Sequence, residues 1–245
     1  GWLAACGQDP SRTPPQVAAD AVPAGTQLGS GSVAGRVRFT GVAPEPEPIA
    51  MGSDAACSRK HDGPARREDL VVSPDGGVAN AFVRIASGLP DRPFAPPSTP
   101  VRLDQRGCVY RPHVVALQAG QPLLIVNSDP TLHNVHAIAT DNPGFNFGMS
   151  VEGQQVTRYF HHPEVMVKLK CDVHPWMAAW IGVVDHPYHA VTGPDGGFAL
   201  TGLPAGEYAV EVWHETLGTA TRTVAVVEGA RQEIEFSFAR SHGPG

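Results

Sequence analysis

The stretch Cys171-Asp-Val-His174-Pro-Trp-Met177 places a thiol, an imidazole and a thioether at three-residue intervals. Apolar runs at residues 165–170 and 180–184 flank it, and both contain the valine, isoleucine or tryptophan residues that favour β-strands. We therefore expect a short loop between two strands. Such a loop brings three metal-binding side chains close enough together to hold one ion.

A further imidazole is available from Leu132-His133-Asn134-Val135-His136, which also has the composition of a strand. One cysteine, two histidines and one methionine are the ligand set of a blue-copper site. In such a site three strong ligands lie in a trigonal plane and a thioether binds weakly along the axis. Because the loop supplies three of these donors, we expect His133 on a neighbouring strand to supply the fourth.

Three neighbouring residues enter the same hypothesis. His136 is a secondary candidate ligand, which we expect on the same face of the strand as His133. Met149 is an alternative to Met177 as the axial thioether. The side chain of Asn134 is expected to join the two ligand segments by a hydrogen bond to the loop or to the cysteine sulfur, a kind of contact that orients ligands.

Zinc and catalytic sites are the alternatives. A cysteine and two histidines can also bind Zn²⁺, but a zinc hydrolase needs an open coordination position and a general base. The sequence contains no His-Glu-x-x-His motif, and a binuclear copper centre would need a second cysteine beside Cys171. A metal-bound thiolate is not free to act as a nucleophile. We therefore expect no enzymatic activity.

The pattern Cys-x-x-His-Pro-x-Met at 171–177, preceded by Asn127 and by His133-Asn-Val-His136, resembles the cupredoxins of the amicyanin and plastocyanin type. The resemblance covers about residues 101–186, and the insert 141–149 departs from it. It implies a Greek-key β-sandwich with one type 1 copper ion. The ligands that it implies are His133, Cys171, His174 and Met177.

The resemblance also implies single-electron transfer with a redox partner protein. In it the edge of His174 reaches the surface, and Pro175, Trp176 and Trp180 form the docking patch. Small, weak interfaces suit such encounters. Two other classes of function remain open. One is a copper carrier or sensor that transfers metal; the other is an adhesion or carbohydrate-binding β-module with an incidental copper site.

The flanking segments point to a second β-unit. Residues 192–210 resemble the end of a carboxypeptidase regulatory-like, or transthyretin-like, sandwich, and residues 35–41 and 79–85 resemble its beginning. We expect one such sandwich interrupted by the cupredoxin, or else an N-terminal extension and a separate C-terminal module. The fold class is all-β in both cases, with strands at 69–73 and 78–85 among others. The expected divisions are 31–100 for the N-terminal β-segment, 101–186 for the cupredoxin and 187–240 for the C-terminal unit.

The N-terminus and the cysteines indicate the compartment. Leu3-Ala-Ala-Cys6 resembles a bacterial lipobox, so we expect residues 1–30 to be a signal remnant and tether, with Cys6 lipidated. With Cys171 assigned to copper, Cys57 and Cys108 can form a disulfide in an oxidising compartment. The expected location is the periplasm or cell surface, with membrane contact only through the lipid. The net charge of −6 and the lack of a basic stripe argue against nucleic acid as a partner.

Overall fold

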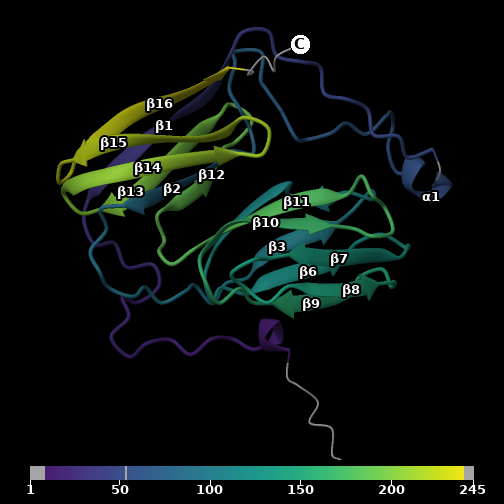
Figure 1. The fold of residues 1–245 in the computed structure, drawn as a ribbon, viewed down its shortest axis with the longest axis horizontal. Coiled ribbons are helices and arrows are strands. Elements are labelled where there is room, and N and C mark those ends of the chain that lie inside the picture. Colours follow the sequence, from purple (N-terminus) through teal and green to yellow (C-terminus); the bar gives the residue numbers. More distant parts are fainter. Residues whose placement is uncertain (1–8, 53, 240–245) are drawn as a thin grey trace, which may run out of the picture.

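The computed structural model describes residues 9–52 and 54–239. It confirms the all-β prediction, because these residues form sixteen strands and two short helical segments, η1 (Pro10–Arg12) and α1 (Ala55–Ser58). The strands build two sandwiches that lie against each other (Figure 1). We name them the central sandwich, formed by β3 to β11, and the flanking sandwich, formed by β1, β2 and β12 to β16.

The central sandwich has sheets of order β5-β11-β10-β7-β8 and β4-β3-β6-β9. Their inner faces enclose one apolar cluster that includes the fully buried Leu103, Leu123 and Ile125. The insert supplies an edge strand, β8, beside β7. The strand bounds are β3 (Val101–Gln105), β4 (Tyr110–Arg111), β5 (Val114–Gln118), β6 (Leu123–Asn127), β7 (His133–Ile138), β8 (Phe145–Met149), β9 (Gln155–Arg158), β10 (Glu164–Lys170) and β11 (Ala178–Val184).

The flanking sandwich has sheets of order β13-β1-β16 and β12-β2-β14-β15. The chain leaves this sandwich after β2 and returns to it at β12. Its first strand lies between two of its last, since β1 pairs antiparallel with β13 and parallel with β16. The strand bounds are β1 (Gly31–Thr40), β2 (Phe82–Ser87), β12 (His189–Val191), β13 (Gly197–Leu203), β14 (Gly206–His214), β15 (Gly218–Val226) and β16 (Arg231–Ala239).

Two expected strands differ from the observed ones. The strand expected at 78–85 begins only at Phe82, because Asn80 has a positive φ of 61° that interrupts extended backbone. The segment expected as a strand at 69–73 forms a single bridge between Val72 and Val78. The segment instead runs as a turn-rich connection toward β2.

The two sandwiches meet through an apolar interface between the β5–β11 sheet and the β2–β14 sheet. The ring of Phe82 on β2 lies against Gly182 of β11, where a Cβ atom added to the glycine would come within 2.6 Å of the ring carbons. Trp180 and Trp213 pack with ring centroids 5.1 Å apart. Glu215 accepts hydrogen bonds from Trp180 Nε1, at 2.8 Å, and from His113. The interface therefore combines close apolar packing with a small polar network.

Gly182→Ala tests this packing. The added methyl group has no space beneath Phe82, so the free energy of unfolding should fall by about 1–3 kcal/mol, the usual cost of overpacking a core. Denaturant unfolding monitored by tryptophan fluorescence measures this change. Gly148→Ala is the matched control on β8, since its Cβ meets only the Leu132 side chain at 3.4 Å and the His133 carbonyl oxygen at 3.8 Å. An equal loss in both variants would contradict the assignment.

Two buried histidines should make the stability of the flanking sandwich depend on pH. Burial lowers the pKa of His186 and of His214 to about 4, whereas an unfolded histidine titrates near 6.5. Between these values the unfolded chain binds more protons than the folded chain. The free energy of unfolding should therefore fall as the pH is lowered from about 6.5 to 4, by up to roughly 3 kcal/mol for each histidine.

His214→Asn is the matching variant. The asparagine oxygen can still accept the backbone N–H groups of Thr216 and Leu217 that His214 Nδ1 accepts, but it does not titrate. Denaturant unfolding at several pH values should show a smaller pH slope in this variant than in the wild type. His162→Asn, at an exposed position, should leave the slope unchanged.

Candidate metal centre

The loop between β10 and β11 is folded tightly on itself. The Cys171 backbone N–H donates to the Met177 carbonyl at 3.2 Å, and the Met177 N–H donates to the His174 carbonyl at 2.9 Å. These bonds turn all three predicted ligand side chains into the central core, where Cys171 and Met177 are each 1% exposed. Pro175 lies on the outside of the turn. Because proline has no backbone N–H group, no donor at this position needs a partner.

The fourth predicted residue, His133, is the first residue of β7. This strand pairs antiparallel with β10, so His133 lies beside the end of β10 that leads into the loop. Its Nδ1 lies 3.1 Å from Nδ1 of His174, and that atom lies 3.9 Å from the Cys171 sulfur. One ligand atom from each of the three residues falls within 4.8 Å of the other two. The strand pairing therefore brings the two ligand segments together.

These separations match the donors of a single ion. Bonds of about 2.0 Å to nitrogen and about 2.3 Å to sulfur place neighbouring donors roughly 3–4 Å apart. The two imidazoles and the free thiol of Cys171 are therefore spaced to bind one metal ion. Imidazole and thiolate together suit copper and also zinc.

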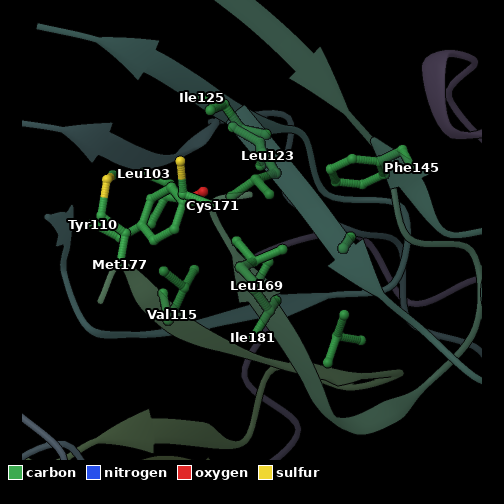
Figure 2. Packing of buried hydrophobic residues seen from close by; sticks show 14 of the residues in the cluster. Leu103, Tyr110, Val115, Leu123, Ile125, Phe145, Leu169, Cys171, Met177 and Ile181 are labelled. Atoms are coloured by element: carbon green, nitrogen blue, oxygen red, sulfur yellow. The ribbon is translucent and has the colours of Figure 1, made fainter. Parts of the chain in front are cut away.

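Both candidate thioethers are buried. Figure 2 shows Cys171 and Met177 at the same end of the apolar cluster, with their sulfur atoms directed the same way. Met149 lies on β8 opposite His133, and its sulfur accepts a hydrogen bond from Gln105 Nε2 at 3.1 Å. The Met149 sulfur thus already accepts a hydrogen bond, whereas Met177 belongs to the loop that carries two of the other predicted ligands.

The thiol is surrounded by hydrogen-bond donors. The backbone N–H groups of Asn134 and His174 both point at the Cys171 sulfur, each at 3.3 Å. Burial raises the pKa of this thiol, but the hydrogen bond with His133 and these N–H groups outweigh it and lower the pKa overall. The Asn134 side chain joins the two ligand segments, since its oxygen accepts the Asp172 N–H at 3.0 Å. The site therefore favours the thiolate, the form that binds metals.

The outer nitrogen of His133 faces a buried carboxylate that the sequence did not single out. Asp129 accepts from His133 Nε2 at 2.9 Å and from the backbone N–H groups of Gly107 and Cys108 at 2.9 and 2.8 Å. Lys60 Nζ lies 3.1 Å from the same carboxylate. Burial raises the pKa of Asp129, yet these donors together hold it well below its usual range. Asp129 therefore fixes the orientation of the imidazole with Nδ1 toward the site.

His174 is buried, so the expectation that its edge reaches the surface is wrong. The side chain is 3% exposed. Its Nε2 lies 3.2 Å from the Asp54 carboxylate and 3.6 Å from the Cys57 sulfur. Both residues belong to the stretch of residues 49–52 and 54–65, which we name the covering segment. Nothing in the local sequence pattern of this segment indicates what it lies on.

A disulfide joins the covering segment to the central sandwich. The sulfur atoms of Cys57 and Cys108 lie 2.04 Å apart. Cys108 precedes β4, and its carbonyl accepts a hydrogen bond from Trp176 Nε1 at 2.9 Å. The disulfide is thus in contact with the ligand loop as well as with His174.

The remaining predicted residues take different positions. His136 points to the opposite face from His133, because the two are three residues apart on a strand; it is paired with Asp172 near the surface, so the expected shared face is wrong. Pro175 is exposed and Trp176 is half-buried, while Trp180 lies at the interface between the sandwiches. Cys6 lies outside the described residues.

Asp129→Asn tests the role of the buried carboxylate in the metal-free protein. An amide side chain can accept hydrogen bonds from fewer of the four donor groups than the carboxylate does. The free energy of unfolding should therefore fall by about 1.5–3 kcal/mol, the usual range for a hydrogen bond to a charged group. Because the pKa of Asp129 is depressed in the folded state, this stabilisation is present near neutral pH and is lost as the pH falls through the acidic range. Chemical denaturation at pH 7 measures the loss. Glu152→Gln, at an exposed carboxylate, should change stability by less than about 0.5 kcal/mol.

Comparison with known proteins finds solved structures that are similar to part of this chain, with low sequence identity and low TM-scores. No protein-family model matches the chain, and no curated protein matches it. A Cu-containing nitrite reductase from Thermus scotoductus SA-01 is 21% identical with a TM-score of 0.34, and the match covers 41% of this chain but only 26% of the reductase. A purple cupredoxin from Nitrosopumilus maritimus is 19% identical with a TM-score of 0.30, covering 34% of this chain and 98% of that one. A Cu(I) amicyanin variant is 20% identical with a TM-score of 0.32, covering 41% and 97%.

The helical segments η1 and α1 are three and four residues long. Within residues 9–52 and 54–239, no helix has the length and apolar character needed to cross a bilayer.

Proposed function

We propose that this protein holds one copper ion in a mononuclear type 1 site and transfers single electrons. The observation that carries the proposal is the convergence of two imidazole Nδ1 atoms and a thiol in a buried cage, with donors 3.1 and 3.9 Å apart. Copper is favoured over zinc because the same loop also carries a soft thioether, Met177, which is buried at the same end of the apolar cluster as Cys171. A Cys, two His and Met set is the ligand set of blue-copper sites.

The protein contributes a cage that is already arranged for the ion. His133 is held by β7 and by Asp129, and His174 and Cys171 are held by the closed loop and its backbone hydrogen bonds. The bound copper would supply the one-electron chemistry. The residues around it keep water out and fix the donor positions. Little rearrangement would then accompany a change in the charge of the ion.

Electrons would leave the site through Trp176. Its ring lies with its centroid 5.1 Å from that of His174, and it is partly exposed, whereas His174 is covered. We place the docking surface for a redox partner protein around Trp176 and the exposed Pro175. Trp180 packs against Trp213 at the interface between the sandwiches, and it lies behind this docking surface instead of forming part of it.

The proposed location is outside the cytoplasm, in the periplasm or at the cell surface. The disulfide between Cys57 and Cys108 supports this, because such bonds persist in oxidising compartments. A lipid on Cys6 would attach the protein to a bacterial membrane, with the residues before β1 as the tether. Mass spectrometry of the protein isolated from its native membrane would detect the lipid.

The optical spectrum of the copper-loaded protein tests the function. The Cu(II) form should absorb strongly near 600 nm, as expected of the blue-copper proteins that the sequence resembles. Cys171→Ser should abolish this band, because it removes the thiolate. A reversible one-electron wave in voltammetry should accompany the band. A colourless copper-loaded wild type, or unchanged copper affinity in Cys171→Ser, would overturn the assignment.

Two methionine variants test the axial ligand. Met177→Leu removes the proposed weak donor, so the reduction potential measured by voltammetry should rise, because the axial ligand tunes the potential of such sites. Met149→Leu is the matched control. It should leave the potential near that of the wild type. The free energy of unfolding should fall by about 1–3 kcal/mol, because Gln105 Nε2 loses a buried acceptor. The reverse pattern would assign Met149 as the axial ligand.

A further inference from the structure

The proposed copper ligands are all buried side chains in the part of the chain that the structure describes. His133 is fully buried, and Cys171, Met177 and His174 are 1–3% exposed. On the Nε2 side of His174, the groups in contact with the imidazole are Asp54 and the Cys57 sulfur of the covering segment. A metal ion that approaches from this side therefore meets the covering segment first.

Several contacts hold the covering segment in place, and one of them is covalent. Met51 is buried in the central apolar cluster, and Lys60 pairs with Asp129. His61 Nε2 hydrogen-bonds to the Gly107 carbonyl at 2.7 Å. The disulfide between Cys57 and Cys108 adds the covalent restraint. Breaking that bond leaves a polar, partly exposed segment held by a few noncovalent contacts.

The two cysteines of this disulfide, together with His174, form a second group of potential metal-binding residues. The sulfur atoms of Cys57 and Cys108 and one ring nitrogen of His174 fall within 4.8 Å of one another, and all three residues are buried. His174 thus faces two sulfur-containing groups. Its Nδ1 points toward Cys171 and His133, and its Nε2 points toward Cys57. Two thiolates and an imidazole are donors that Cu(I) prefers.

We propose that Cys57 and Cys108, once reduced, form with His174 a Cu(I)-binding site through which the metal centre is loaded. This rests on the proposed copper function. The reductant is a dithiol, such as a thiol–disulfide oxidoreductase outside the cytoplasm. One thiolate of the dithiol attacks a sulfur of the disulfide to give a mixed disulfide. Its second thiol then releases the other cysteine, so that a disulfide forms in the reductant and two thiols form here.

Cu(I) binding at this site involves no electron transfer. The two thiols lose their protons as they bind the ion, and the copper remains Cu(I). When both sites are filled, His174 also loses its remaining ring proton, so that its two nitrogen atoms bridge the two ions as an imidazolate. After the ion has moved to the inner donors, an external disulfide reoxidises the pair by the reverse exchange. The covering segment is then fixed again over His174. The disulfide state therefore separates a loading form from a closed form that suits electron transfer.

Copper stoichiometry in the full-length metal-free chain tests the proposal. The disulfide-intact protein and protein reduced with a dithiol, then freed of it anaerobically, are titrated with Cu(I) in competition with a coloured Cu(I) chelator. The intact form should bind one equivalent and the reduced form two. Cys57→Ser/Cys108→Ser should bind one under both conditions. Cys171→Ser should keep the additional equivalent when reduced, which distinguishes this site from the inner one.

The loading rate gives a second measurement. After Cu(I) is added, portions taken at successive times are oxidised with ferricyanide, and the visible band of each portion measures the copper at the inner site. This band should grow roughly tenfold or more faster in reduced than in intact protein, because a disulfide that closes a long loop restricts opening. The band also shows that the reduced chain remains folded. A single equivalent in the reduced wild type, or two equivalents in the double serine variant, would overturn the proposal. Absence of the band from intact copper-loaded protein would instead overturn the proposed function, independently of Cys57 and Cys108.

Discussion

Burying two imidazoles and a thiol in an apolar core is the constraint on which the rest of this structure depends. Buried polar groups destabilise a fold unless each has a partner. Here the inner atoms of His133, Cys171 and His174 face one another, so every outer atom needs a partner elsewhere. The Asp129 carboxylate forms a hydrogen bond with His133, and the Asp54 carboxylate forms one with His174. Two backbone N–H groups donate to the sulfur. The donor atoms thereby remain directed at one point.

This requirement links the candidate metal centre to distant parts of the chain. Asp129 lies in the turn between β6 and β7 and accepts the N–H of Cys108, which is bonded to Cys57. Asp54 and Cys57 belong to the connection between β1 and β2, two strands of the flanking sandwich. The covering segment is therefore tethered at both ends to one sandwich while it lies over the site of the other.

The interface between the sandwiches adds a second link. β11 begins directly after the ligand loop and carries Trp180 and Gly182, which face Trp213 and Phe82 of the flanking sandwich. β11, which follows the loop directly, therefore packs against the central apolar cluster on one face and against the flanking sandwich on the other. Such support suits a site whose donors must keep their positions.

The sequence by itself determined the all-β class and indicated the candidate metal-binding loop, because strand alternation and the spacing of Cys171, His174 and Met177 are local properties. It also indicated His133, since an imidazole on a strand is a natural fourth donor. The burial of His174 and the partners Asp54 and Asp129 were not predictable, because they depend on which loop covers the site and no local pattern encodes that. The opposite face of His136 could have been predicted, since strand alternation sets it. Only the tertiary structure decided that β7 and β10 pair so that two Nδ1 atoms come within 3.1 Å, and that a disulfide-bound segment closes the site.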